Sequence, residues 1–190
     1  MAAKIPEGAV CSGDAESLAA GTRMLVLDVD GVMTDGRLLY GPEGQLIKSF
    51  NTQDGLGIST AHKAGLRLAM ITGRDDAAVR VRAEHLRIDE YHPGHDSKLP
   101  TLKEISARLQ IPLIAMAYLG DDWIDLDPMN AVGLPMAVAN ARPEVKAAAK
   151  YVCAASGGHG AVREAIEFIL SSRPGAAPLW NYWVLPESGN

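Results

Sequence analysis

The chain has 190 residues, which is enough for one well-buried domain and too few for two comfortable ones. Its 47% apolar and 22% charged residues are typical of an ordinary soluble globular protein, and its net charge of −5, without any Lys/Arg block, argues against a nucleic-acid partner. With only Cys11 and Cys153, no disulfide framework is expected, which favours the cytoplasm. Residues 1–23 lack the apolar core of a secretory leader, and no apolar run approaches the roughly 20 residues that span a bilayer, so no membrane partner is expected.

Apolar runs and helical patterns alternate along the chain after residue 23. Strands are predicted at 24–29, 66–71, 88–91, 114–119, 134–138 and 150–153. Helices are predicted at 55–64, 75–86, 98–109, 122–131, 143–148 and 159–171. This βαβα order predicts an α/β fold, a three-layer Rossmann-like arrangement around a parallel sheet. We therefore divide the chain into an N-terminal extension (1–23), one α/β domain (24–172) and a C-terminal tail (173–190).

Residues 36–50 interrupt this alternation. Two short apolar segments flank Gly41-Pro42-Glu43-Gly44, which is a typical turn sequence, so a β-hairpin is predicted there. No insertion elsewhere is long enough for a separate lid domain. The fold is therefore expected to be capless, with this hairpin as its only local flap.

Two aspartates follow the first predicted strand. The run 24–27 leads directly into Asp28 and Asp30, and then into Gly31. Ligands of parallel sheets bind at the carboxyl ends of the strands, where these side chains would lie. Two carboxylates without a partner would repel at a cost of several kcal/mol, so a cation is expected beside them. The alternative is a strand end with two solvated aspartates.

Three later segments favour phosphate chemistry. The strand at 66–71 ends in Thr72 and Gly73, whose hydroxyl and amide suit a phosphate oxygen at a helix start. Lys98 opens a helical pattern, where the helix dipole disfavours a cation, so an anionic partner is expected. The strand at 114–119 ends in acid at Asp121, with Asp125 one turn further. Each segment has an ordinary explanation alone, such as a capping threonine, but their order together favours a phosphate site.

These segments match, in order, the four motifs of the haloacid dehalogenase-like (HAD) phosphohydrolases. The matching residues are Asp28-Val29-Asp30-Gly31-Val32, Thr72-Gly73-Arg74, Lys98 and Gly120-Asp121-Asp122. The chain resembles most closely one branch of that superfamily, the KdsC-type phosphatases of 3-deoxy-D-manno-octulosonate 8-phosphate. The resemblance runs from about residue 24 to residue 170, through DVDGVMTDG, NTQDGLGI, ITGR, GDDWIDLDPM and GGHGAVREAIEFIL.

The resemblance implies a Mg²⁺-dependent phosphomonoester hydrolase that works through an aspartyl-phosphate. Asp28 would attack phosphorus, and Asp30 would protonate the departing sugar oxygen and later accept a proton from water. The implied metal ligands are Asp28, the backbone carbonyl of Asp30, and Asp121. The family's pathway is lipopolysaccharide precursor synthesis.

The resemblance also assigns residues to the phosphoryl group. Thr72, the Gly73 amide and Lys98 would hold its charged oxygens. Asp122 and Asp125 are expected to orient Lys98 or the waters around the metal rather than to bind the metal themselves.

The sugar acid is expected to contact Arg74, Arg82 and the stretch that comprises Asn51, Thr52, Gln53, Asp54 and Gly55. For the two arginines, the alternative is a solvated helix face. Two positions depart from the family pattern, because Ser59 and His159 stand where arginine is usual. Losing a charge-assisted contact at Ser59 would remove about 1.5–3 kcal/mol of binding unless His62 or Lys63 compensates. A related nine-carbon ulosonate phosphate, or a broader range of sugar phosphates, therefore stays open as substrate.

The family further implies a homotetramer with active sites near subunit interfaces. The tail contains Trp180, Tyr182 and Trp183, which the resemblance implies would dock on an adjacent subunit; the alternative is a frayed terminus. Two other functions fit the sequence less well. A non-catalytic oligomerisation module is disfavoured because the motif residues are intact, and a phosphosugar mutase is disfavoured because such enzymes usually carry a large cap.

Overall fold

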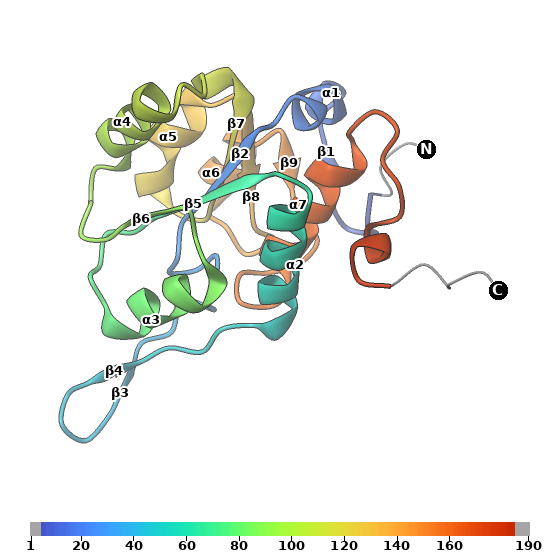
Figure 1. Cartoon of the computed structure of the whole chain (residues 1–190). Coiled ribbons are helices and arrows are strands. Elements are labelled where there is room, and N and C mark those ends of the chain that lie inside the picture. Colours follow the sequence, from blue (N-terminus) through green and yellow to red (C-terminus); the bar gives the residue numbers. More distant parts are fainter. Residues whose placement is uncertain (1–4, 185–190) are drawn as a thin grey trace.

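The structure, a computed structural model, describes residues 5–184 and is organised around one twisted sheet (Figure 1). Its strand order is β1-β9-β8-β7-β2-β5-β6, and every neighbouring pair is parallel except β1 with β9. The strands are β1 (Val10–Cys11), β2 (Met24–Leu27), β5 (Arg67–Ile71), β6 (Glu90–His92), β7 (Met116–Gly120), β8 (Leu134–Ala137) and β9 (Tyr151–Val152).

Helices cover both faces of this sheet, so the prediction of a three-layer α/β fold is confirmed (Figure 1). One layer contains α1 (Ala15–Ala20), α2 (Thr52–Lys63), α3 (Ala77–Leu86) and α7 (Ala161–Ser171). The other contains α4 (Lys98–Leu109), α5 (Leu126–Ala131) and α6 (Pro143–Ala148). Three short 3₁₀ turns complete the described chain: η1 (Leu113–Ala115), η2 (Trp123–Asp125) and η3 (Leu179–Tyr182).

The central strands are apolar because helices cover both of their faces. All four residues of β2 and all four of β8 are buried. A strand buried on both sides has no solvent face, and therefore shows a continuous apolar run instead of an alternating pattern. This is why the runs at 24–29, 66–71, 114–119 and 134–138 were recognisable in the sequence.

The boundaries differ from the predicted ones in a few places. Residues 113–115 follow Pro112 in a 3₁₀ turn, so β7 begins at Met116. The predicted helix 122–131 begins as the 3₁₀ turn η2 and becomes α-helical at Leu126. Before residue 24, β1 pairs with β9 and α1 packs against α7, although no element was predicted there. The division of the chain at residue 24 stays a prediction.

The flap is the hairpin of β3 (Leu39–Tyr40) and β4 (Leu46–Ile47), which extends away from the body of the domain (Figure 1). It exposes four large apolar side chains, those of Leu38, Leu39, Tyr40 and Ile47. A hairpin of this size is marginal by itself in water, so its position depends on its anchoring to the domain.

The flap leads into α2, which crosses α7 closely. A Cβ at Gly57 would lie 2.9 Å from the Cα of Arg163, so only glycine permits this approach of the two helices. Asp54 of α2 is buried, and its Oδ1 accepts a hydrogen bond from the Arg163 amide at 2.9 Å. A carboxylate near the first turn of α7 also matches the helix dipole. The two helices are therefore joined at their N-terminal ends.

The described part of the tail lies on its own chain. Trp183 donates from Nε1 to the hydroxyl of Thr60 at 2.9 Å. The ammonium of Lys63 lies 3.6 Å from the centroid of the Trp183 ring and donates to the Tyr182 carbonyl. Docking of the tail on a neighbouring subunit stays a prediction, and residues 185–190 lie outside the described range. Within residues 5–184, no helix is long and apolar enough to cross a membrane.

Candidate active site

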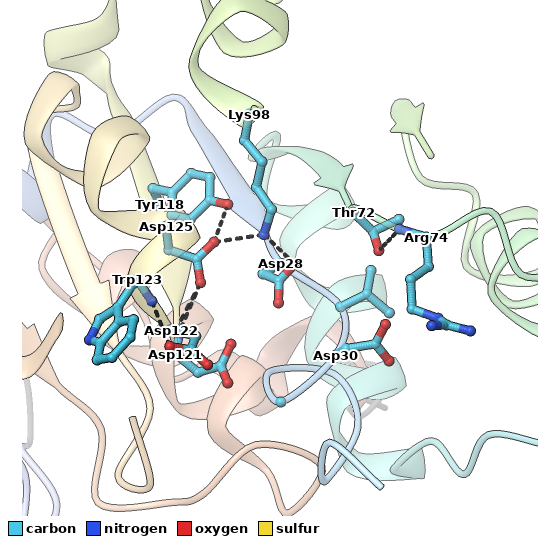
Figure 2. A network of polar contacts seen from close by, with 12 residues as sticks. Asp28, Asp30, Thr72, Arg74, Lys98, Tyr118, Asp121, Asp122, Trp123 and Asp125 are labelled. Atoms are coloured by element: carbon cyan, nitrogen blue, oxygen red, sulfur yellow. Dashed lines mark hydrogen bonds and ion pairs between the residues drawn. The ribbon is translucent and has the colours of Figure 1, made fainter. Parts of the chain in front are cut away.

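The predicted motif residues meet at the carboxyl edge of the sheet (Figure 2). Asp28 follows β2, Thr72 follows β5 and Asp121 follows β7. These three strands are neighbours in the order β7-β2-β5, so their carboxyl ends lie side by side. Lys98 reaches the same place from the first residue of α4.

Lys98 lies between two buried carboxylates. Its Nζ donates to Oδ1 of Asp28 at 2.5 Å and to Oδ1 of Asp125 at 2.7 Å, and its side chain is fully buried (Figure 2). Burial acts to lower the pKa of Lys98, but the attraction of Asp28 and Asp125 outweighs burial and raises the pKa. Lys98 is therefore a charged group fixed beside Asp28.

Asp125 organises the surrounding loop with both of its oxygens. Besides Lys98, its Oδ1 accepts a hydrogen bond from the Tyr118 hydroxyl at 2.7 Å. Its Oδ2 accepts from the amides of Asp121 and Asp122 at 2.9 and 3.2 Å. The expected contact of Asp125 with Lys98 is thus present. The Asp122 side chain instead caps η2, where its Oδ1 accepts from the Trp123 amide at 2.7 Å.

Tyr118 is a site residue that the sequence interpretation missed. It is fully buried in β7, and burial, followed by repulsion from Asp125, raises its pKa well above the usual value. The available signal was a hydroxyl within an otherwise apolar strand, because a buried tyrosine usually needs a hydrogen-bond partner.

The aspartates form a cluster that suits a divalent cation. One oxygen of each of Asp28, Asp121 and Asp125 lies within 4.8 Å of the others. Burial, reinforced in both cases by neighbouring carboxylates, raises the pKa of Asp28 to about 6 and that of Asp121 to about 8. Lys98 supplies one positive charge against three carboxylates. Both oxygens of Asp125 already accept hydrogen bonds from protein groups. Asp28 and Asp121 therefore remain as hard oxygen donors for a cation.

Without metal, the cluster should make stability depend on pH. The folded-state pKa values of Asp28 and Asp121 lie above the ordinary 3.8, so the folded chain binds more protons than the unfolded chain at intermediate pH. We therefore expect the free energy of unfolding, measured by urea titration in chelator, to fall from about pH 5 to about pH 8. A divalent cation at ~100 times its Kd should add about 2.7 kcal/mol. Stability that rises over this window would contradict the expectation, and Asp127→Asn on the exposed face of α5 is the control.

Asp30 lies on the other side of the site. Figure 2 shows its carboxylate turned toward Arg74 and away from Lys98. Lys48, one residue beyond β4, donates to both Asp30 oxygens at 2.5 and 2.8 Å. The same ammonium lies 2.7 Å from Oδ2 of Asp76, which also accepts from Nε of Arg74 at 3.1 Å. Lys48 and Asp76 were not predicted, because nothing in the local pattern links them to Asp30.

The proposed phosphate-binding residues line the end of β5. Thr72 is buried, and its Oγ1 accepts from the Arg74 amide at 3.3 Å. Gly73 lies between them and is half-buried. The Arg74 side chain is 45% exposed, which leaves its guanidinium reachable from solvent. The structure therefore brings Thr72 and Gly73 to the edge that carries Asp28.

The predicted sugar-acid residues fall into two groups. Asn51 caps α2 by accepting from the Gln53 amide at 2.7 Å, and its Nδ2 donates to the Gly158 carbonyl at 3.3 Å. Thr52 and Gln53 are exposed. These residues lie at the surface beside the end of the flap.

The second group is engaged in packing. Asp54 holds the start of α7, as described above, and a Cβ at Gly55 would lie 2.8 Å from Nη2 of Arg82. The same Nη2 donates to the Asn51 carbonyl at 3.1 Å. Sugar-acid contacts by these residues stay predictions, and the contacts that are present join α2, α3 and α7.

The two positions that depart from the family pattern lie in different surroundings. Ser59 donates to the Gly55 carbonyl at 3.1 Å within α2. His159 lines a polar cleft of about 380 Å³ together with Asp35 and Arg37. This cleft lies beside the Asp30 loop, because the loop that carries His159 packs against Gly31: a Cβ at Gly157 would lie 1.7 Å from the Gly31 carbonyl oxygen.

Comparisons with known proteins agree with this geometry. Residues 90–166 match the haloacid dehalogenase-like hydrolase family. The chain is 40% identical over 159 residues to the 3-deoxy-D-manno-octulosonate 8-phosphate phosphatase KdsC of Escherichia coli K12, covering 84% of this chain and 85% of that protein. It is 43% identical over 152 residues to KdsC of Yersinia pestis, covering 80% and 81% of the two chains.

Solved structures are similarly close. The 3-deoxy-D-manno-octulosonate 8-phosphate phosphatase of Yersinia pestis superposes with a TM-score of 0.83 at 41% identity, over 85% of this chain and 87% of that one. The enzyme of Moraxella catarrhalis, solved with magnesium, phosphate and KDO, gives 0.82 at 38% identity, over 84% and 92%. From its sequence, its fold and these relatives, the chain belongs to the KdsC family of haloacid dehalogenase-like phosphatases.

Proposed function

We propose that this phosphatase releases phosphate from 3-deoxy-D-manno-octulosonate 8-phosphate in lipopolysaccharide precursor synthesis, in the cytoplasm and with Mg²⁺. The observation that carries the proposal is the buried Lys98 held between Asp28 and Asp125, at the sheet edge that also carries Thr72 and Asp121. The names of the KdsC relatives support the choice of substrate.

Asp28 acts as the nucleophile in this proposal. Lys98 engages its Oδ1, which fixes the carboxylate and leaves Oδ2 to attack phosphorus. Attack breaks the bond from phosphorus to the sugar oxygen and forms an aspartyl-phosphate, which water then hydrolyses to restore Asp28. Lys98 also offsets the charge of the transferring phosphoryl group, whose remaining oxygens are held by the Thr72 hydroxyl and the Gly73 amide.

Asp30 acts as the acid and base. It gives a proton to the sugar oxygen as that oxygen leaves, and takes one from water in the second step. Asp30 is turned away from Lys98 (Figure 2). In an in-line displacement the leaving oxygen lies opposite the nucleophile, where Asp30 would reach it.

Mg²⁺ would be held by Asp28, the Asp30 carbonyl and Asp121. Its donor set is all oxygen, and the pKa values of Asp28 and Asp121 are raised by burial and by neighbouring carboxylate charge, which a cation would offset. When bound, it supplies charge neutralisation between the carboxylate nucleophile and a dianionic ester.

We also propose a homotetramer with active sites near subunit interfaces. The apolar side chains exposed on the flap are consistent with burial against another copy. Light scattering should then give about four times the 20.2 kDa of one chain. A fully active monomer would contradict this assembly.

The test of the function is phosphate release from a panel of sugar and sugar-acid phosphates, with Mg²⁺ and with chelator. We expect metal-dependent turnover that is strongest on the octulosonate phosphate. An alternative outcome is turnover that is stronger on a nine-carbon ulosonate phosphate, or spread over simple sugar phosphates. Either result would support a phosphatase with a different substrate, which would agree with the departures from the family pattern at Ser59 and His159. No turnover on any phosphate would favour a non-catalytic oligomerisation module.

A further inference from the structure

Lys48, at the end of the flap, is buried between two carboxylates from different parts of the chain. Its side chain is 0% exposed and its Nζ contacts Asp30 and Asp76. We propose that Lys48 is the positioning residue that aims the Asp30 carboxylate at the leaving oxygen of the substrate. The inference rests on the proposed function, in which Asp30 is the acid.

The energetics of burial make this contact specific. Removing an ammonium group from water costs several kcal/mol unless close opposite charges compensate. Lys48 donates to both oxygens of Asp30, at 2.5 and 2.8 Å, so the contact restricts rotation of the carboxylate as well as its position. Through Lys48, the flap therefore sets the position and orientation of the Asp30 carboxylate.

Asp76 anchors the ammonium from the other side. It lies directly before α3 and also accepts from Arg74, so it is fixed to the body of the domain. Burial acts to raise the pKa of Asp76, but its bonds with Lys48 and Arg74 lower it overall, which keeps it an anionic partner for Lys48. Lys48 is therefore held at a set distance from the sheet edge even though it belongs to the flap.

Without Lys48, Asp30 would be free to adopt other rotamers. Its carboxylate lies only partly buried, with 24% of the side chain exposed, so packing alone does not fix it. A misplacement of about 1 Å in a reacting group can cost about 10²-fold in rate. In phosphoenzyme formation, the loss should appear only where the leaving oxygen needs the proton from Asp30; hydrolysis of the phosphoenzyme, which also uses Asp30, is common to all substrates.

The experiment compares Lys48→Met on two substrates whose leaving groups differ. A sugar alkoxide needs protonation to leave, whereas the p-nitrophenolate of p-nitrophenyl phosphate does not. We expect kcat/KM, which reports the steps up to formation of the phosphoenzyme, to fall about 10²-fold for the sugar-acid phosphate and to change by less than about threefold for p-nitrophenyl phosphate. Lys48→Arg, which keeps the charge, should restore part of the sugar-acid rate.

Two comparisons separate positioning from structure. Lys150→Met removes a surface ion pair with Asp14 and should leave both rates unchanged. A retained kcat/KM for p-nitrophenyl phosphate in Lys48→Met shows that the variant is folded. Equal losses of kcat/KM on both substrates, or no loss on either, would overturn the inference while leaving the phosphatase function standing. A wild-type chain inactive on both substrates would overturn the proposed function itself.

Discussion

Asp28→Asn is expected to abolish phosphate release from every substrate, with a loss of at least about 10⁴-fold. An amide has nearly the shape of the carboxylate, and its oxygen can still accept the bond from Lys98, but it is too weak a nucleophile to form the phosphoenzyme. Initial rates with saturating Mg²⁺, measured on the octulosonate phosphate and on p-nitrophenyl phosphate, test this. A good leaving group should not rescue the variant, in contrast to Lys48→Met.

The same substitution should stabilise the metal-free fold near neutral pH. Burial raises the pKa of Asp28 to about 6, which means that its charged form is disfavoured by its surroundings. A neutral amide removes that cost, so urea midpoints at pH 7 in chelator should rise while activity disappears, as is common where an active site carries strain.

Asp127→Asn is the matched control, because Asp127 is exposed on α5 and is not assigned to the site. It should leave the rate unchanged and, because Asp127 lies in the first turn of α5, alter stability by at most about 1 kcal/mol. If Asp28→Asn kept more than about one hundredth of the wild-type rate, the nucleophile would have to be another group.

Sequence predicted the site best where one physical rule links local pattern to position. Strands buried on both faces have continuous apolar runs, and parallel strands bring their carboxyl ends to one edge. These two rules place Asp28, Thr72 and Asp121 together without any knowledge of contacts. The anionic partner of Lys98 could be predicted for a similar reason, since the helix dipole disfavours an unpaired cation at a helix start.

The flap contacts could not be predicted in the same way. Lys48 lies 18 residues from Asp30 across an irregular segment, and no periodicity determines where a hairpin folds back. The two residues of β1 are also too few for a pattern, and their pairing with β9 is visible only in three dimensions. For Asp54 the sequence motif predicted a contact with substrate, whereas in the structure its Oδ1 accepts a hydrogen bond from the Arg163 amide at the start of α7.

Lys98→Met is expected to lose both activity and stability. Methionine fills similar space but leaves Asp28 and Asp125 buried together without a counter-charge. Breaking a buried ion pair by removing one partner typically costs about 3–5 kcal/mol. Loss of the positive charge should also raise the pKa of Asp28 further, so the destabilisation should be larger at about pH 8 than at about pH 5, where protonation relieves it. Urea titrations in chelator at the two pH values measure this.

A double-mutant cycle isolates the ion pair from packing. Asp125→Asn in the Lys98→Met background removes one of the two unpaired carboxylates, so it should recover part of the lost stability but none of the activity. Lys103→Met on the same helix is the control, since Lys103 is exposed and should be neutral in both assays. Stability lost without activity would make Lys98 only a structural cation. Activity lost with an unchanged pH dependence of unfolding would mean that its charge does not control the buried carboxylates, and the electrostatic account of the site would fail.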